Sequence, residues 1–487
     1  MRKSQSLPSL WLSVFKYEAS AGLNLCDQLC VTLRKAITQG HLRQGERLPS
    51  TRTLASDLAI SRVTAESAYA RLEAEGYVSR RVGHGTVVKI IISDKEKSTA
   101  AVPTSAALRR PAPLSRRGAA IVGGACVDPR SLCAFSAGSP DLGAFPLDVW
   151  RKITARHLRQ DGPALMGYGD PQGYAPLRTA IAHYLNQSRG VRCDATQVVV
   201  LTSSQQALQL LATLLLDPGD SVWIEEPGYL GARSAFSCAA AEVLPVPVDA
   251  NGMVIDLAQP PPKLIYVTPS HQYPTGVTLS LQRRLALLDY ARLHRCWLIE
   301  DDYDSEFQYD ARPTPSMQGL DIHGRVIYIG TFSKVLFPSL RLAYLVLPSS
   351  LVSALSTART TYDGHTAQLM QAVTAEFISG GHFAAHIRQM RLLYSSRRDL
   401  LLEQIGRKLG SWLTPVASSG GLQLTALLPE GRELILTRQA SALGVATPSL
   451  SALYLRTPER DGWVLGYAGL KNEEIVAGVD RLARIMP

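Results

Sequence analysis

The chain has 487 residues, of which 46% are hydrophobic and 19% are charged, a composition typical of a globular protein with two or three domains. No stretch approaches the roughly 18 apolar residues of a membrane span, and residues 1–20 lack the apolar core of a signal peptide, so we expect a cytoplasmic protein that does not enter membranes. The seven cysteines lack the spacing of metal ligands, so we expect no metal site.

The positive charge is confined to the N-terminal part of the chain. Residues 1–92 carry 13 Lys and Arg against 7 Asp and Glu, residues 93–135 carry 7 against 3, and the remaining 352 residues balance at 31 against 31. A basic module beside a neutral bulk indicates a polyanionic partner. Residues 93–135 are rich in Ala, Ser, Pro and Arg without a sustained apolar period, which predicts a linker.

Within the basic module the sequence predicts three helices. Apolar residues three and four positions apart predict the first helix over 25–37. Ser50 can cap a short helix over 51–58, and Ser61 can cap another over 62–75. Two short helices joined by a tight turn form a helix-turn-helix.

In such a unit, residues at the N-terminal end of the second helix contact base edges and phosphates. Here we expect Arg62, Thr64 and Glu66 to face outward and Val63 to pack inward. An ordinary small helical domain with a solvated basic face would give a similar pattern. The position in the chain, the charge and the segment that follows together favour DNA binding.

That following segment, "YVSRRVGHGTVVKI", predicts a two-stranded wing with residues 83–85 at its tip. Arg80 and Arg81 then lie where a wing meets the DNA backbone or the minor groove.

Residues 25–90 resemble the winged helix-turn-helix of GntR-type bacterial transcription regulators, above all in "LPSTRTLASDLAISRVTAESAYARLEAEGYVSRRVGHGTVV". The resemblance implies that Arg52, Arg62, Thr64 and the wing around Gly85 contact double-stranded operator DNA. It does not indicate which operator is bound.

Beyond residue 135, short apolar runs alternate with helical segments, which predicts a mostly parallel sheet buried on both faces. In such sheets ligands bind at the carboxyl ends of the strands, so polar residues at those ends can form one site. The runs lie in "QVVVLTSSQQALQLLATLL", "DSVWIEEPGY", "KLIYVTPSHQYPTG", "CWLIEDDYDSEF", "RVIYIGTFSKVL" and "RLAYLVLPSS".

Four polar residues at the ends of these runs, Lys334, Asp301, Tyr303 and Tyr229, predict a site for an aldehyde cofactor with a pyridine ring. Lys334 follows a strand and can form a Schiff base if burial favours its neutral amine. Asp301 closes another strand, where its carboxylate can keep a pyridine nitrogen protonated and make the ring an electron sink. Tyr303 can hydrogen-bond a ring phenolate, and Tyr229 can stack on the ring.

Neighbouring strand ends also supply groups for a phosphate. Arg341, Thr331 and Ser333 offer a guanidinium and two hydroxyls, while Ser204 and Gln205 open a helix with free N–H groups. Each residue alone also has an ordinary interpretation as a cap, a core-edge residue or a surface charge. Their joint position at strand exits favours a single site.

Residues 135–487 resemble the fold type I pyridoxal-phosphate aminotransferases, and the loop "YGDPQGYAPLR" resembles the one whose tyrosine, here Tyr168, reaches the cofactor phosphate of the neighbouring subunit. Fusion to a winged helix resembles the MocR subfamily of GntR-type regulators. The resemblance implies pyridoxal 5'-phosphate as cofactor, a head-to-tail homodimer, and a small-molecule effector that is an amine, an amino acid or a B6 vitamer.

The expected fold is therefore multidomain. We expect an α+β winged helix-turn-helix over 1–92, a flexible linker over 93–135, and an α/β fold type I aminotransferase-like sensor domain with a mostly parallel sheet over 136–487.

Two departures from the aminotransferase pattern bear on function. Tyr273 stands where an Asn usually supports the cofactor phenolate, and Val464 stands where an Arg usually grips the substrate carboxylate. Arg233 is a possible replacement for that arginine. We therefore favour a regulator with at most weak transamination, and keep as the alternative an active aminotransferase with an accessory basic domain.

Overall fold

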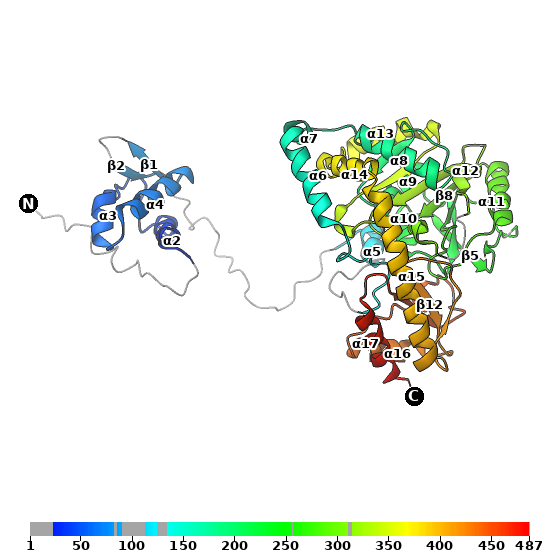
Figure 1. Ribbon diagram of the computed structural model, residues 1–487. Coiled ribbons are helices and arrows are strands. Elements are labelled where there is room, and N and C mark those ends of the chain that lie inside the picture. The colour runs from blue at the N-terminus through cyan, green and yellow to red at the C-terminus, as the bar shows by residue number, and fades with distance from the viewer. Residues whose placement is uncertain are drawn as a thin grey trace, which may run out of the picture. The chain divides into compact units, whose positions relative to one another are not determined.

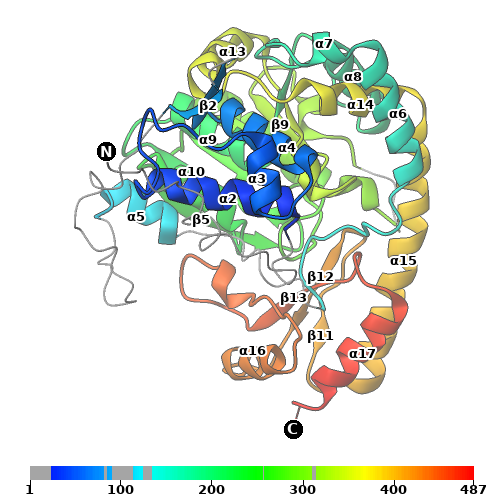
Figure 2. The same cartoon turned by 90° about the vertical axis from the view of Figure 1, so that its left-hand side faces the viewer.

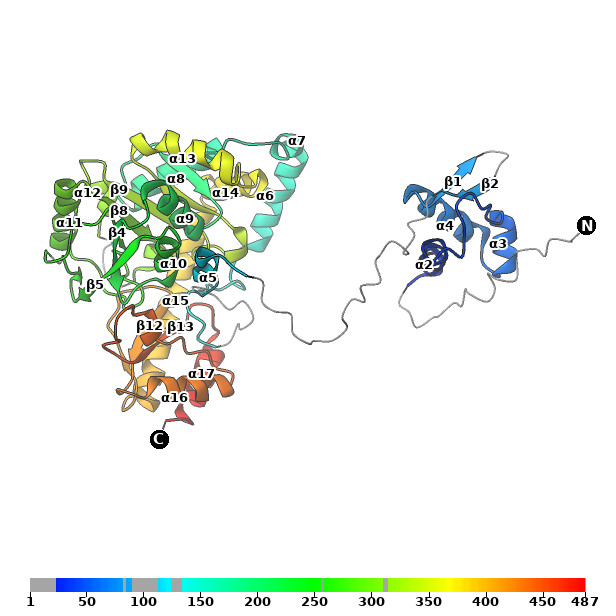
Figure 3. The same cartoon turned by 180° about the vertical axis from the view of Figure 1, so that it is seen from behind.

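The computed structural model describes residues 23–81, 85–89, 113–123, 134–255, 257–309 and 314–486. The chain divides into two compact units, Met1–Ala112 and Pro113–Pro487, which are described separately (Figures 1 and 3). Within those described ranges, none of the helices is both long enough and apolar enough to cross a bilayer.

The first unit is the expected winged helix-turn-helix. Its helices form where capping residues start them: Ser50 Oγ accepts a hydrogen bond from the backbone N–H of Thr53, and Ser61 Oγ accepts one from that of Thr64. Both capped helices end one residue earlier than expected. The elements are α2 (Leu25–Thr38), α3 (Thr51–Asp57), α4 (Arg62–Ala74) and the antiparallel strands β1 (Val78–Arg81) and β2 (Gly85–Val88).

The prediction that Val63 packs inward is wrong, because this residue is 74% exposed. The buried residues of α4 are Ala65, Ala68, Tyr69 and Leu72, which recur three and four positions apart. Val63 precedes Ala65 by two residues, roughly 200° around the helix, and therefore lies on the opposite face.

The second unit contains an eight-stranded sheet of order β3-β10-β9-β8-β7-β4-β5-β6. Strands β5, β4, β7, β8 and β9 are parallel, whereas β10 is antiparallel to both of its neighbours, so the sheet is mostly parallel as expected. The strands are β3 (Val198–Leu201), β4 (Ser221–Glu226), β5 (Glu242–Asp249), β6 (Gly252–Met253), β7 (Leu264–Val267), β8 (Trp297–Asp302), β9 (Val326–Thr331) and β10 (Ala343–Val346).

Helices cover both faces of this sheet, which explains the continuous apolar runs in its central strands (Figures 1 and 3). One face packs against α9 (Ser204–Leu215), α10 (Leu230–Cys238) and α13 (Ser349–Tyr362). The other face packs against α8 (Ala175–Ser188), α14 (Gln368–Ser379), α15 (His382–Lys408), α11 (Leu281–His294) and α12 (Met317–Leu320), with α6 (Leu147–Gln160) outside α14 and α7 (Gly162–Leu165) after it.

A smaller antiparallel sheet lies at the C-terminal end of the long helix α15, which runs beside α17 (Figure 2). Its strands are β11 (Thr414–Pro415), β12 (Gln423–Leu427) and β13 (Gly462–Gly466). It is accompanied by α16 (Glu433–Ala442) and α17 (Asn472–Ala483), and short 3-10 turns occur at Ser305–Phe307, Pro338–Leu340 and Ser451–Leu453.

The stretch expected as a linker contains a helix in its described part. Helix α5 (Arg116–Gly123) contacts α10 and therefore belongs to the second unit. Eight residues are too few to reveal a helical period in the sequence. Residues 93–112 and 124–133 of the expected linker lie outside the described part of the chain.

Candidate functional site

The carboxyl ends of the parallel strands bring the predicted cofactor residues to one edge of the sheet. Ser204 follows β3, Tyr229 follows β4, Tyr273 follows β7, Asp301 lies next to the last residue of β8, and Lys334 follows β9. This is the edge at which open α/β sheets bind ligands.

Lys334 is half-buried, and its Nζ donates a hydrogen bond to the carbonyl oxygen of Gly138 at 2.9 Å. Burial lowers the pKa of Lys334, while the nearby carboxylates of Asp304 and Asp301 act in the opposite direction. A Cβ at position 138 would lie 2.8 Å from Nζ, so glycine permits this close approach. The lysine amine is therefore held in an enclosed position that favours its neutral, nucleophilic form.

Asp301 has one paired and one unpaired carboxylate oxygen. Oδ2 accepts a hydrogen bond from the hydroxyl of Tyr266 at 2.8 Å, whereas Oδ1 is buried and has no partner within the described residues. Burial raises the pKa of Asp301 to about 7; Asp302 and Asp304 add to the rise, and Tyr266 and Lys334 oppose it. A buried, unpaired acceptor of this kind fits a protonated ring nitrogen, which supplies both a donor and a positive charge.

Aromatic rings line the same edge. The ring centroids of Tyr229 and Tyr273 are 5.8 Å apart, and those of Tyr273 and Tyr303 are 6.2 Å apart. The hydroxyl of Tyr229 also lies 3.5 Å from Oε1 of Gln205, which joins the ends of β3 and β4. The structure thus brings Tyr229, Gln205 and Tyr303 into one neighbourhood, with Tyr273 between the two predicted tyrosines.

His271 is a buried residue of this neighbourhood that the sequence did not single out. Its Nδ1 lies 3.0 Å from both the hydroxyl of Tyr303 and Oδ2 of Asp304, and its Nε2 lies 2.9 Å from Oγ of Ser418. The side chain therefore fixes Tyr303 against the loop at residue 418. Its place in "PSHQYPTG", directly after a strand, was the available signal.

The residues expected to bind a phosphate lie at the ends of β3 and β9 and just before β10. Ser204 and Gln205 begin α9, and the hydroxyl of the preceding Ser203 caps that helix through the N–H of Gln206. Thr331 is buried and its hydroxyl accepts a hydrogen bond from the N–H of Ser333 at 3.2 Å. Arg341 is exposed in a left-handed backbone conformation with φ of 53°.

Tyr168 does not belong to the site of its own chain, because its side chain is fully exposed on the loop before α8. Its ring makes an edge contact with His365 at a centroid distance of 6.0 Å. A large exposed aromatic residue on a loop is available to a second molecule.

Val464 occupies an apolar environment in the small sheet. It is completely buried on β13, directly opposite Thr425, and clusters with Leu450 and Leu453. Arg233, the possible replacement for the missing arginine, donates to the carbonyl oxygen of Tyr454 at 3.4 Å.

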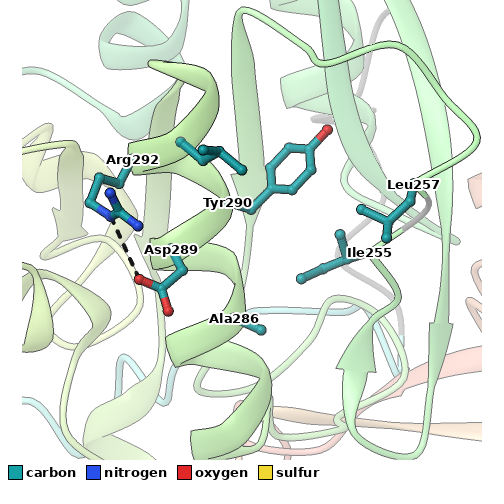
Figure 4. Close-up of a pocket in the computed structure, with 7 residues that line it drawn as sticks. Ile255, Leu257, Ala286, Asp289, Tyr290 and Arg292 are labelled. Atoms are coloured by element: carbon teal, nitrogen blue, oxygen red, sulfur yellow. Dashed lines mark ion pairs between the residues drawn. The ribbon is translucent and has the colours of Figure 1, made fainter.

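A separate pocket of about 390 Å³ lies beside α11 and involves none of these residues (Figure 4). Its polar groups are mainly the ion pair between Asp289 and Arg292, at 3.8 Å. The described residues that line it include no lysine, so this pocket does not offer an amine to an aldehyde cofactor. The lining residues are Ile255, Leu257, Ala286, Asp289, Tyr290, Arg292 and Leu293.

On the winged helix unit, the residues predicted to contact DNA differ in solvent exposure and in the partners of their side chains. Arg52 on α3 and Arg62 on α4 are exposed. Thr64 is half-buried, and its hydroxyl lies 2.8 Å from that of the capping residue Ser61. Arg62 and Arg52 can therefore reach a partner directly, whereas Thr64 also serves the helix start.

Of the two wing arginines, Arg81 is exposed, whereas Arg80 forms ion pairs with Glu66 and Glu73 of α4. Arg80 thus holds the wing against the recognition helix, with its charge compensated. The expected tip residues Gly83 and His84 lie outside the described residues.

Arg47 lies beside the wing, although no pattern in the sequence singled it out. Gly85 has φ of 76°, and a Cβ there would lie 2.8 Å from Nε of Arg47. Arg47 therefore adds a guanidinium beside the wing, and its isolated antiparallel bridge to Val87 of β2 is a long-range contact that no periodic signal could indicate.

Comparison with known proteins identifies both units. Residues 25–88 match the bacterial regulatory proteins of the gntR family, and residues 131–482 match the aminotransferases of class I and II. The chain is 40% identical over 472 residues to the probable rhizopine catabolism regulatory protein MocR of Rhizobium meliloti, covering 96% of this chain and 94% of that protein. It is 30% identical over 459 residues to the pyridoxine biosynthesis transcriptional regulator PdxR of Corynebacterium glutamicum, covering 93% of each.

Enzymes resemble the second unit alone. The crystal structure of the α-aminoadipate aminotransferase LysN of Thermus thermophilus, complexed with N-(5'-phosphopyridoxyl)-L-leucine, matches with a TM-score of 0.68 and 30% identity, covering 76% of this chain and 94% of that chain. The kynurenine aminotransferase of Pyrococcus horikoshii, in complex with PMP, matches with a TM-score of 0.68 and 28% identity, covering 73% and 91%. The chain belongs to the MocR-type proteins of the GntR family, and it is a DNA-binding transcription regulator with a fold type I aminotransferase-like domain.

Proposed function

We propose that this regulator binds double-stranded operator DNA through residues 1–92 and senses a small amine, amino acid or B6 vitamer through a pyridoxal 5'-phosphate site in residues 136–487, with residues 93–135 as the connection. The observation that carries the proposal is the buried Oδ1 of Asp301, which has no partner among the described residues and lies at the same sheet edge as the enclosed amine of Lys334. A transcription regulator acts where DNA is, which supports a cytoplasmic location.

The residues present fit the cofactor. Lys334 would supply the amine for covalent attachment, Asp301 would pair with the ring nitrogen, Tyr303 would donate to the ring oxygen and Tyr229 would contact the ring. When bound, pyridoxal phosphate supplies an aldehyde that reacts with primary amines. The groups that would hold its phosphate are those of Arg341, Thr331, Ser333, Ser204 and Gln205.

The full exposure of Tyr168 supports a head-to-tail homodimer in which this residue completes the phosphate site of the partner. The same loop in both subunits would then serve two equivalent sites, as a twofold interface requires.

On the DNA side, exposed Arg62 and Arg52 are assigned to base edges or phosphates and Arg81 and Gly85 to the wing contact. Thr64 positions the start of α4. Arg80 is assigned to the wing through its pairing with Glu66 rather than as a free charge.

Effector sensing requires that two states of the protein bind the effector with different free energies. Lys334 contacts the backbone at Gly138, so a ligand that takes the place of the lysine amine also removes this contact. The segment at Gly138 lies beside the small sheet. A Cβ at Gly466 of β13 would overlap the carbonyl oxygen of Ser136, so the backbones of the two segments are in close contact. Ligand binding can thus bias the position of the small sheet.

The alternative function is transamination. It is favoured by the 31% identity to the 2-aminoadipate transaminase of Thermus thermophilus, which covers 73% of this chain. Burial of Val464 among apolar side chains argues against it, because a valine at this position cannot form the bidentate pair with a substrate carboxylate.

The test is a footprint on the DNA upstream of the protein's own gene, made with full-length protein loaded with pyridoxal phosphate. We expect a protected site that requires a higher protein concentration in Arg62→Ala, while the absorption spectrum of the bound cofactor is unchanged. Rapid and complete conversion of the bound cofactor by common amino acids, without any protected DNA, would instead establish the aminotransferase.

A further inference from the structure

One face of the small sheet is directed at the cofactor residues. Thr425 on β12 and Val464 on β13 are directly opposite each other, and Gln423 lies two residues before Thr425, so the three side chains share a face. The hydroxyl of Thr425 donates to the carbonyl oxygen of Pro274 at 2.6 Å. This bond fixes the face against the turn that carries Tyr273.

Gln423 brings an unpaired acceptor close to the reactive lysine. The residue is only 3% exposed, and its Oε1 has no hydrogen-bond partner within the described part of the chain. A Cβ at Gly138 would lie 3.5 Å from this oxygen and 2.8 Å from Nζ of Lys334. The amide oxygen and the lysine amine therefore border the same small space.

A second unpaired acceptor lies nearby. Oδ2 of Asp304 contacts His271, but its Oδ1 is buried and without a partner in the described ranges. The carboxylate of Asp304 is close enough to Lys334 to raise the pKa of that lysine. Buried acceptors without partners are costly, and a ligand that brings O–H or N–H donors removes this cost.

The position beside these acceptors does not suit a carboxylate. Val464, Leu450 and Leu453 offer neither a charge nor a donor, the polar groups packed against them are the hydroxyls of Tyr273 and Tyr454, and Arg233 donates to the backbone of Tyr454 at 3.4 Å. A carboxylate placed here would lose its hydration without compensation.

We propose that the effector is a primary amine that carries hydroxyl groups and no α-carboxylate, and that one hydroxyl donates to Oε1 of Gln423. This inference rests on the proposed function, because it assigns the ligand class of the same site. Gln423 then determines specificity: a site with a buried acceptor discriminates strongly against an analogue that lacks the matching donor.

Three amines with the same carbon skeleton test the proposal: 2-amino-1,3-propanediol, serine and isopropylamine. Full-length protein loaded with pyridoxal phosphate is titrated with each, and dissociation constants are measured by calorimetry and from the absorption change of the bound cofactor. We expect the diol to bind at least about tenfold more tightly than either of the others. Gln423→Leu should reduce its advantage over isopropylamine to about twofold or less, whereas the same change at exposed Gln439 should leave the ranking intact.

Equal or tighter binding of serine by the unmodified protein would overturn the inference, and this ranking needs no variant to fold. An undiminished preference for the diol in Gln423→Leu would overturn the assignment of Gln423. If none of the amines binds, the proposed sensing itself fails. If all three bind equally, the sensing function stands and the proposed effector class is wrong.

Discussion

At the scale of single residues, the enclosed amine of Lys334 connects the physical chemistry of the site with its function. Burial lowers the pKa of this lysine, and the carboxylates of Asp304 and Asp301 partly offset that effect. The neutral amine is the form that reacts with an aldehyde. The acidic neighbours thus set the pH range in which the cofactor attaches.

Asp304→Asn gives a prediction with a definite sign. The carboxylate of Asp304 raises the pKa of Lys334 and so partly offsets the effect of burial. Without this carboxylate the pKa of Lys334 falls further. The rate at which pyridoxal phosphate becomes covalently attached should reach half of its maximum at a lower pH than in the unmodified protein. The matched control is Asp399→Asn, an exposed site, and a midpoint that moves to higher pH would contradict the account.

The two arginines at the DNA face should differ in effect. If the side chain of Arg62 contacts a base, Arg62→Ala is expected to weaken operator binding by about 1–3 kcal/mol. If it contacts a phosphate, the salt slope, which is the slope of the logarithm of the binding constant against the logarithm of the salt concentration, should fall in magnitude by about one unit. Arg80→Ala should change the salt slope less, because Glu66 and Glu73 already compensate its charge. The salt slopes are measured by fluorescence anisotropy with labelled operator DNA over a series of salt concentrations. Equal slopes for both variants would show that Arg80 does not stay paired with Glu66 and Glu73 on DNA.

At the scale of elements, the start of α4 matters for both folding and DNA binding. Ser61→Ala removes the cap of this helix and is expected to destabilise the winged helix unit by about 1 kcal/mol. Ser50→Ala removes the equivalent cap of α3 and should cost a similar amount. Hydrogen exchange of the full-length protein measures both losses. Ser61→Ala should weaken DNA binding more than Ser50→Ala, because α4 carries Arg62 and Thr64 whereas α3 carries Arg52, and equal losses of affinity in both variants would contradict this assignment.

Much of this architecture was predictable from local signals. The caps Ser50 and Ser61 act within three residues of the chain, so the sequence indicates their helices almost to the residue. The apolar strands are buried on both faces, and their polar exits at Asp301 and Lys334 therefore stood out. Strand order and antiparallel β10 depend on long-range pairing, which no local pattern contains.

The errors in prediction have the same physical origin. Val63 was misplaced because a single apolar residue says little about which face of a helix is buried. Gln423 and His271 were missed because their importance arises from contacts with Gly138 and Tyr303, which are distant in the sequence. Val464 was noticed only through resemblance, and its apolar surroundings emerged from packing.

At the scale of the whole molecule, the proposed dimer makes each cofactor site depend on two chains. Tyr168→Phe should weaken retention of pyridoxal phosphate, and Lys334→Ala should abolish the covalent link that borohydride can reduce. Each site of the proposed dimer contains Lys334 of one subunit and Tyr168 of the other. In a mixed dimer of the two variants, one site therefore carries both changes and the other site carries neither. Mixing the variants should therefore restore one site per dimer with normal retention. Absence of any restored site would contradict the shared arrangement.

The central claim is that an amine at the Lys334 site changes the affinity of the protein for its operator. The most direct measurement is the dissociation constant for a fluorescent operator duplex, with full-length protein carrying pyridoxal phosphate, over a titration with 2-amino-1,3-propanediol. We predict a saturable change of about 5–150-fold, the usual range of coupling between two sites, and no change in Lys334→Ala. Operator affinity that is independent of the amine, while calorimetry shows that the amine is bound, would contradict the account.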